Sequence, residues 1–126
     1  HAMTDVTGFG LAGHALEMAR GSGCRLRIDF SQVPLLDQAR ELAEAGFVTG
    51  ASARNWASYG EDVDHARDMT EIDQALLCDP QTSGGLLVAC AEESVSAVLD
   101  VFRSHGFAAA AVIGEATDGE ARLAVA

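Results

Sequence analysis

The sequence contains no lysine, and its 8 basic residues are all arginines. This absence excludes chemistry that needs a lysine within the chain, such as Schiff-base formation or the phosphate-binding lysine of a P-loop. Against those arginines stand 19 Asp and Glu residues, which give a formal net charge of −11. A chain this acidic, with no basic stripe, does not favour nucleic acid or an anionic membrane as a partner. An anionic small molecule could still bind, through a metal ion.

Cysteine and long apolar runs are also scarce. The 3 cysteines show no C-x-x-C spacing, so neither a disulfide framework nor a thiolate zinc site is indicated. The longest apolar run, from Phe107 to Ile113, is far shorter than the roughly 18–20 residues of a membrane span. We therefore expect a cytoplasmic protein. The first residues, His1-Ala2-Met3, favour either a tagged chain or a piece of a longer protein.

The length and the 48% apolar content suit one domain with a sizeable core. Apolar spacing predicts helices over residues 11–19, 35–43, 72–77 and 92–105, the last with one side facing inward. Alternation or short apolar runs predict strands over residues 24–30, 86–89, 107–113 and 123–125. Asp118-Gly119 is a hairpin signal before the last of these strands. Residues 47–73 lack periodicity and are expected to form an ordered loop followed by an acidic, solvated stretch. This order predicts an α+β fold with a single mixed sheet of about four strands covered by helices.

Residues 4–11, Thr-Asp-Val-Thr-Gly-Phe-Gly-Leu, lead directly into the first predicted helix. The glycines permit close backbone approach, and the helix start offers unpaired N–H groups to an anion. Asp5 would repel a phosphate there unless a divalent cation lay between them, and its hard oxygen ligands suit Mg²⁺. On the local pattern alone, a helix cap formed by Asp5 or Thr7 is the favoured interpretation.

Other polar positions give weaker signals. Residues 79–85 could form an anion-binding nest, but a plain turn into a strand is favoured. His14 is expected to be a packed or surface histidine rather than a metal ligand. Arg54 and Asn55 could contact a phosphate or a carboxylate, but a salt bridge that stabilises the loop is at least as favoured. Cys78 has no neighbouring cation in the sequence that would activate its thiol.

Two of these segments, taken together, resemble a known family. Residues 4–11 with Gly13-His14-Ala15, and residues 78–87 with the letters CDPQTSGGLL, resemble the carboxy-terminal half of the selenophosphate synthetase (selenide, water dikinase) family. Residues 54–60 between them, and Ile113-Gly114-Glu115 near the end, are also similar to that family. The resemblance spans nearly the whole chain.

The resemblance implies that residues 1–126 are the single carboxy-terminal domain of a larger two-domain enzyme. Such enzymes use ATP, selenide and water to make selenophosphate, AMP and phosphate, with Mg²⁺ on the triphosphate, and they are dimers related to aminoimidazole ribonucleotide synthetase. Asp5 is then expected to be a Mg²⁺ ligand rather than a cap, with Thr4, Thr7, Gly8 and Gly10 near the nucleotide phosphates.

The resemblance places the catalytic Cys or selenocysteine and the Lys in an amino-terminal domain that this sequence lacks. No catalytic residue is therefore expected here, and the fragment alone should be inactive. Two alternatives stay open: a related ATP-dependent synthetase of the same superfamily that acts on another acceptor, or a non-catalytic dimerisation or scaffold domain.

Overall fold

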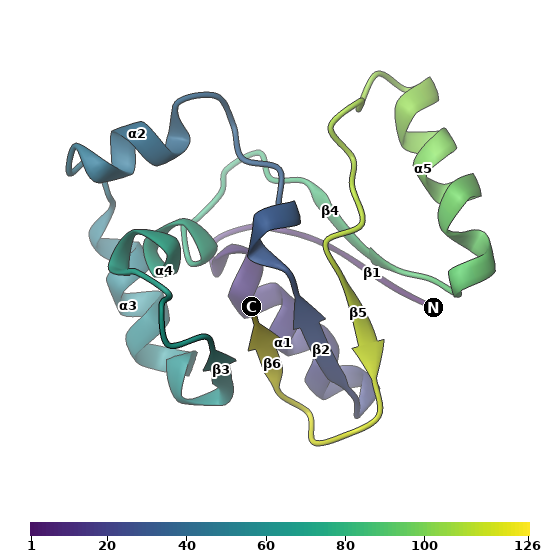
Figure 1. The fold of residues 1–126 in the computed structure, drawn as a ribbon, viewed down its shortest axis with the longest axis horizontal. Helices are drawn as coiled ribbons and strands as arrows, with labels where there is room; N and C mark the ends of the chain where they lie inside the picture. The colour runs from purple at the N-terminus through teal and green to yellow at the C-terminus, as the bar shows by residue number, and fades with distance from the viewer.

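A computed structural model describes residues 1–126 and contains two sheets and five α-helices (Figure 1). The strands are β1 (Ala2–Asp5), β2 (Arg25–Ile28), β3 (Val63–His65), β4 (Leu86–Ala89), β5 (Gly114–Thr117) and β6 (Leu123–Val125). The helices are α1 (Gly10–Ser22), α2 (Ala39–Glu44), α3 (Gly50–Tyr59), α4 (Glu71–Leu77) and α5 (Val95–Ser104). The predicted α+β class with a mixed four-stranded sheet is confirmed, and a separate two-stranded sheet adds to it.

Strand β2 lies inside the four-stranded sheet, whose order is β3-β6-β2-β5. It is antiparallel to β5 and parallel to β6, and β3 is parallel to β6. The alternation predicted for this strand is confirmed, because Leu26 and Ile28 are buried whereas Arg27 between them is exposed. Since successive side chains of a strand point to opposite faces, one face of the sheet is apolar and packs on the core.

The second sheet pairs β1 with β4 in antiparallel register, from Ala2 opposite Ala89 to Asp5 opposite Leu86. The strand predicted at residues 86–89 therefore forms, but it does not join the larger sheet. Its partner β1 lies where the sequence predicts only the approach to the first helix. This sheet brings the residues before α1 alongside those after residue 85, which lie far away in the sequence.

Helix α1 is the central element of the fold and confirms the helix predicted over residues 11–19. It contacts β1 as well as β2, β6, α3 and α4. Small residues allow this burial on several sides: Ala12, Ala15 and Ala19 have no exposed surface. The main core cluster gathers around this helix and consists of Val6, Leu11, Ala12, Ala15, Leu16, Met18, Ala19, Leu26, Ile28, Tyr59, Val63, Leu77, Cys78, Leu123 and Val125.

The irregular loop predicted within residues 47–73 is wrong, because α3 and β3 form there. Polar residues hide the helical spacing, while Ala51, Ala53 and Ala57 are residues with high helix propensity. The helix predicted at residues 72–77 is confirmed as α4. It begins with a capping box in which the side chain of Thr70 accepts from the backbone N–H of Asp73.

The acidic stretch is not merely solvated. Arg122 contacts Asp62 and Asp64, and Asp64 also pairs with Arg25. The hydrogen bond from Arg122 holds the pKa of Asp64 below its usual range. Asp73 is partly buried, which would raise its pKa, but its bonds to Thr70 and its pairing with Arg40 lower the pKa overall. Several acidic residues of this stretch therefore form ion pairs with arginines from other parts of the chain.

Three further predictions are wrong or only partly right: a strand, a hairpin and the start of α2. The strand expected at residues 107–113 is wrong: that run is irregular, and Phe107 is 63% exposed. Strand β5 begins instead at Gly114, where a Cβ would overlap the carbonyl oxygen of Arg27 on β2. The hairpin expected at Asp118-Gly119 is also wrong, because β5 and β6 lie on opposite sides of β2. Helix α2 begins at Ala39 instead of residue 35, after a left-handed residue at Gln38.

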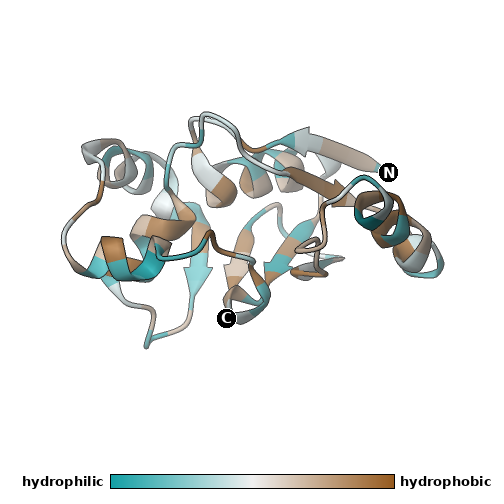
Figure 2. Ribbon diagram, turned by 90° about the horizontal axis from the view of Figure 1, so that it is seen from above, coloured by the Kyte–Doolittle hydropathy of each residue, from teal (hydrophilic) through white to brown (hydrophobic).

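Helix α5 confirms the prediction for residues 92–105, apart from its first residues, which form a 3-10 turn. Its apolar side, however, is only partly covered, and none of its residues is buried. The view from above shows this helix at one end of the molecule (Figure 2). No helix of the chain has the length and apolar character that crossing a membrane requires.

Candidate functional site

The segments that carry the resemblance meet at the start of α1. They are the β1–α1 loop (residues 6–9), one side of α3, and the α4–β4 turn (residues 78–85). Backbone bonds join the loop to the turn: Val6 N donates to Gly85 O at 2.9 Å, and Gln81 N donates to Thr7 O at 3.0 Å. The turn predicted for residues 79–85 is therefore present, and it is bonded to the first motif.

Two glycines allow the close approach of these segments. A Cβ on Gly84 would overlap the carbonyl oxygen of Val6. Gly10 has a φ of +70°, and a Cβ there would lie 2.6 Å from the carbonyl carbon of Cys78. Only glycine fits both positions, since one is sterically closed and the other is also left-handed.

Helix α3 contributes two side chains that bind the carbonyls of the β1–α1 loop. Asn55 Nδ2 donates to Gly8 O and to Cys78 O, each at 2.9 Å. Tyr59 Oη donates to Phe9 O at 2.5 Å. Asn55 and Tyr59 are four residues apart and therefore lie on the same side of the helix. Their neighbour Arg54 is exposed and forms no salt bridge, so the loop-stabilising ion pair considered for it is wrong.

These contacts determine which way the loop's peptide groups point. The carbonyls of Thr7, Gly8 and Phe9 all accept hydrogen bonds from within the chain. The N–H groups of Gly8 and Phe9 donate none. Because the C=O and N–H of one trans peptide point in opposite directions, the engaged carbonyls turn these two N–H groups away from α3 and the α4–β4 turn. Both residues are exposed, and neither N–H has a hydrogen-bond partner within the chain.

Asp5 ends β1 and is exposed. Its carboxylate forms no salt bridge and accepts no hydrogen bond. The cap interpretation is wrong for both Asp5 and Thr7, because the N-cap of α1 is Phe9 and no side chain caps that helix. No three His, Cys, Asp or Glu side chains gather anywhere in the chain in a way that would hold a metal ion. A cation at Asp5 would therefore take its other ligands from outside these residues.

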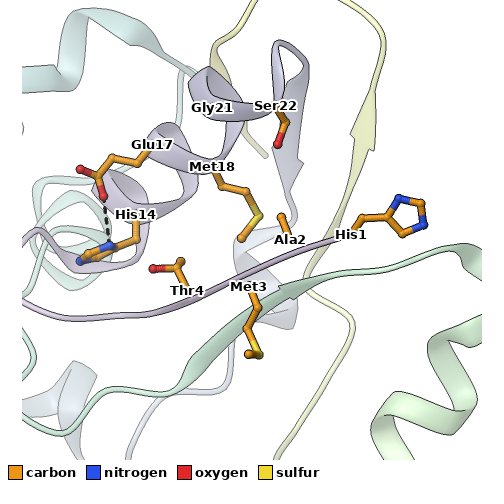
Figure 3. Close-up of a pocket in the computed structure, with 9 residues that line it drawn as sticks. All are labelled: His1, Ala2, Met3, Thr4, His14, Glu17, Met18, Gly21 and Ser22. Atoms are coloured by element: carbon orange, nitrogen blue, oxygen red, sulfur yellow. Dashed lines mark ion pairs between the residues drawn. The ribbon is translucent and has the colours of Figure 1, made fainter.

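Thr7 is bound instead to His14, whose Nε2 lies 3.0 Å from the Thr7 Oγ1. His14 is 7% exposed, which confirms a packed histidine. Its Nδ1 lies 3.3 Å from Glu17 Oε2 but has no partner in hydrogen-bond geometry. His14, Glu17 and Thr4 line an open cavity of about 440 Å³ between β1 and α1 (Figure 3). In the same view Met3 points to the opposite side of β1.

Burial raises the pKa of three titratable groups beside the loop. Burial, reinforced by its interaction with Cys78, raises the pKa of Tyr59 above its ordinary value. Burial likewise raises the pKa of the Cys78 thiol, which has no exposed surface. It also raises the pKa of Asp79, although the Ser52 hydroxyl partly offsets this effect. Cys78 is therefore a structural thiol and not a nucleophile, as the lack of a neighbouring cation indicates.

Sequence reasoning does not foresee that Asn55 and Tyr59 bind the backbone of the first motif. The signal is the four-residue spacing of two polar side chains, which places them together only if the segment is helical. If residues 47–60 are taken as a loop, the four-residue spacing does not predict that the two side chains lie together.

Comparison with known proteins matches residues 1–125 to the family model "AIR synthase related protein, C-terminal domain". A selenide, water dikinase of Dechloromonas aromatica is 58% identical over 120 residues, which are 95% of this chain and 34% of that protein. One of Pseudomonas straminea is 56% identical over 125 residues, 99% of this chain and 35% of that protein. The chain thus spans about a third of the length of these curated relatives. The chain belongs to the AIR synthase related protein family and corresponds to its C-terminal domain.

Proposed function

We propose that residues 1–126 are the carboxy-terminal domain of a selenide, water dikinase, which makes selenophosphate, AMP and phosphate from ATP, selenide and water. In this proposal Asp5 contributes a carboxylate to Mg²⁺ on the nucleotide phosphates. The observation that carries it is the free, exposed carboxylate of Asp5 just before a loop held by the other two motif segments. The dikinase relatives, 51–58% identical to this chain, support the same activity.

The donor chemistry fits Mg²⁺. This hard cation typically takes one or two protein carboxylates and completes its shell with water and substrate phosphates, and when bound it neutralises phosphate charge. Asp5 supplies one such carboxylate without first breaking an ion pair. The outward N–H groups of Gly8 and Phe9, at the start of α1, supply partial positive charge to a phosphate. In this arrangement Asp5 binds the Mg²⁺ ion and the N–H groups of the loop bind the phosphate.

The rest of the reaction is assigned to a preceding part of the protein. This chain has no lysine, and Cys78 is wholly buried. The resemblance to the dikinase family implies that the catalytic Cys or selenocysteine and the Lys lie in an amino-terminal domain. Residues 1–126 alone should then form no AMP from ATP and selenide, and selenide-dependent AMP formation by the isolated chain would contradict this assignment.

The proposal is tested in the full-length protein with Asp5→Ala. Phosphoryl transfer depends largely on positioning and charge neutralisation, so we expect selenophosphate formation to fall at least about tenfold. Thermal stability should stay near that of the wild type, because Asp5 is exposed and unpaired. The matched control is Asp37→Ala, another exposed aspartate without a salt bridge. Wild-type product formation by Asp5→Ala would remove the metal-ligand role.

The acceptor is tested separately, by asking whether AMP release by the full-length protein requires selenide. Selenide-independent AMP release with another acceptor would favour a sister synthetase of the superfamily. We also propose a cytoplasmic homodimer. Sedimentation of the full-length protein as a monomer would contradict the dimer.

A further inference from the structure

Asn55 joins two distant segments with one side-chain amide. Its Nδ2 has two hydrogens, and each has an acceptor 2.9 Å away: Gly8 O in the β1–α1 loop and Cys78 O at the end of α4. The bond to Cys78 O is partly buried, whereas the bond to Gly8 O is exposed to solvent. No other side chain in the chain donates to the carbonyls of both segments.

The bond to Gly8 O bears directly on the direction of the next N–H group. The carbonyl of Gly8 and the N–H of Phe9 belong to one peptide plane and point in opposite directions. Gly8 has no Cβ, so its own backbone angles restrain this plane less than those of any other residue would. A rotation of the plane would present a carbonyl oxygen where Phe9 now presents an N–H. A phosphate would then meet a partial negative charge.

We propose that Asn55 is a positioning residue, whose amide holds the Gly8–Phe9 peptide so that the Phe9 N–H faces the nucleotide phosphates. This inference rests on the proposed function of Asp5 and the β1–α1 loop. Asn55 acts on the nucleotide only through the loop, and it touches no reacting group.

The side-chain requirement is specific. Leucine has nearly the same shape as asparagine but no donors, so Asn55→Leu removes both bonds at small cost in volume. Ser58 on the same helix provides a matched control, because its hydroxyl donates only to the backbone carbonyl of Asn55. Ser58→Ala therefore changes the surface of α3 without touching the loop.

The kinetic test uses the full-length protein. For Asn55→Leu we expect the KM for Mg·ATP to rise about tenfold, as when outer-shell partners of a metal site are lost. The KM for selenide should stay at the wild-type value, and Ser58→Ala should match the wild type throughout. A structural role alone would lower the thermal midpoint and the amount of active protein without selectively raising the KM for Mg·ATP. That result would overturn the inference.

A second measurement needs no variant. In full-length protein carrying isotopically labelled phenylalanine, the Phe9 amide signal should shift when Mg²⁺ and a non-hydrolysable ATP analogue are added. Phe30 is the internal control, because its N–H donates to Ala126 O at 2.8 Å and should not shift. An unchanged Phe9 signal on saturation with the analogue would overturn the inference even if Asn55→Leu failed to fold.

The two proposals fail in different ways. If Asp5→Ala leaves product formation at the wild-type level, the proposed metal site is wrong. If Asp5→Ala is impaired while Asn55→Leu keeps the wild-type KM for Mg·ATP, only the role of Asn55 is wrong.

Discussion

Helices α1 and α5 both follow from apolar spacing in the sequence, yet they occupy opposite environments. Helix α1 has nine buried residues, whereas α5 has none and lies at one end of the molecule (Figure 2). The motif segments pack around the start of α1, and α5 is not among their main packing partners. The difference shows that periodicity predicts a helix but not what covers it. Burial of α1 depends instead on alanines and glycines that let its neighbours approach.

The largest effect that would sharpen this comparison is expected at Gly84, beside α1. Gly84→Ala would force the α4–β4 turn away from Val6, and we expect it to lower the free energy of unfolding by about 3 kcal/mol or more. The adjacent Gly85 serves as the control, because a Cβ added there would have no atom within 4 Å. Chemical denaturation of the two variants is the measurement. Equal stability of Gly84→Ala and Gly85→Ala would contradict the close approach of the two motifs.

The next effect compares the two helices directly. Leu16 on α1 is 1% exposed, and Val101 on α5 is 60% exposed. We expect Leu16→Ala to cost about 2–5 kcal/mol, because it leaves a cavity in the core. Val101→Ala should change the free energy of unfolding by no more than about 0.5 kcal/mol. Similar losses in both variants would mean that α5 is packed as firmly as α1.

A moderate effect is expected from Tyr59, the single tyrosine of the chain. Its pKa is raised in the folded state, so the unfolded state releases this proton first. The stabilising contribution of the protonated Tyr59 hydroxyl is therefore fully present below the unfolded pKa of about 10. The free energy of unfolding falls as the pH rises above that value. Tyr59→Phe should remove this dependence and cost about 1 kcal/mol at neutral pH, through the lost bond to Phe9 O. Tyrosinate absorbance that rose near pH 10 while the fluorescence of Trp56 still reported a folded chain would contradict the burial of this hydroxyl.

The smallest effect on stability is expected from changing Asp64, which lies in the larger sheet. Asp64 has a lowered pKa, so its stabilising contribution is present above the unfolded pKa of about 3.9 and is lost as pH falls. The pair with Arg122 is solvent-accessible, and Asp64→Asn should therefore matter less than the changes above and less still at high salt. Denaturation across pH and salt checks this. A loss as large as that of Leu16→Ala would show that this ion pair, and not α1, dominates stability.

The fold class and the motif positions could be predicted well where a single local signal was enough. The alternation in β2 and the spacing in α1 and α4 are such signals, since each depends only on neighbouring residues. The position of β5 could not be predicted in this way. It depends on Gly114 lying against the Arg27 carbonyl, which is a contact between strands. The run at residues 107–113 is rich in alanine, a poor strand former, and its apolar character makes the strand prediction there misleading.

The candidate site was only partly predictable for a similar reason. The local pattern marks Asp5 as an unusual carboxylate before a helix start but favours a cap, and only the family resemblance indicates a metal ligand, which stays a prediction. The convergence of residues 6–9 with Asn55 and the α4–β4 turn depends on β1 pairing with β4, which no local pattern indicates. The acidic composition does not conflict with a phosphate-binding role. Five of the 19 acidic residues form ion pairs with arginines, whereas Asp5 forms none.

The most direct test of the central claim is the Mg²⁺ dependence of selenophosphate formation by full-length Asp5→Asn, measured beside Asp37→Asn. We predict that Asp5→Asn needs at least about tenfold more Mg²⁺ for half-maximal rate, because a neutral amide replaces a metal carboxylate. Asp37→Asn should keep the wild-type requirement. Identical Mg²⁺ curves for Asp5→Asn, Asp37→Asn and the wild type would contradict the assignment of Asp5 to the metal.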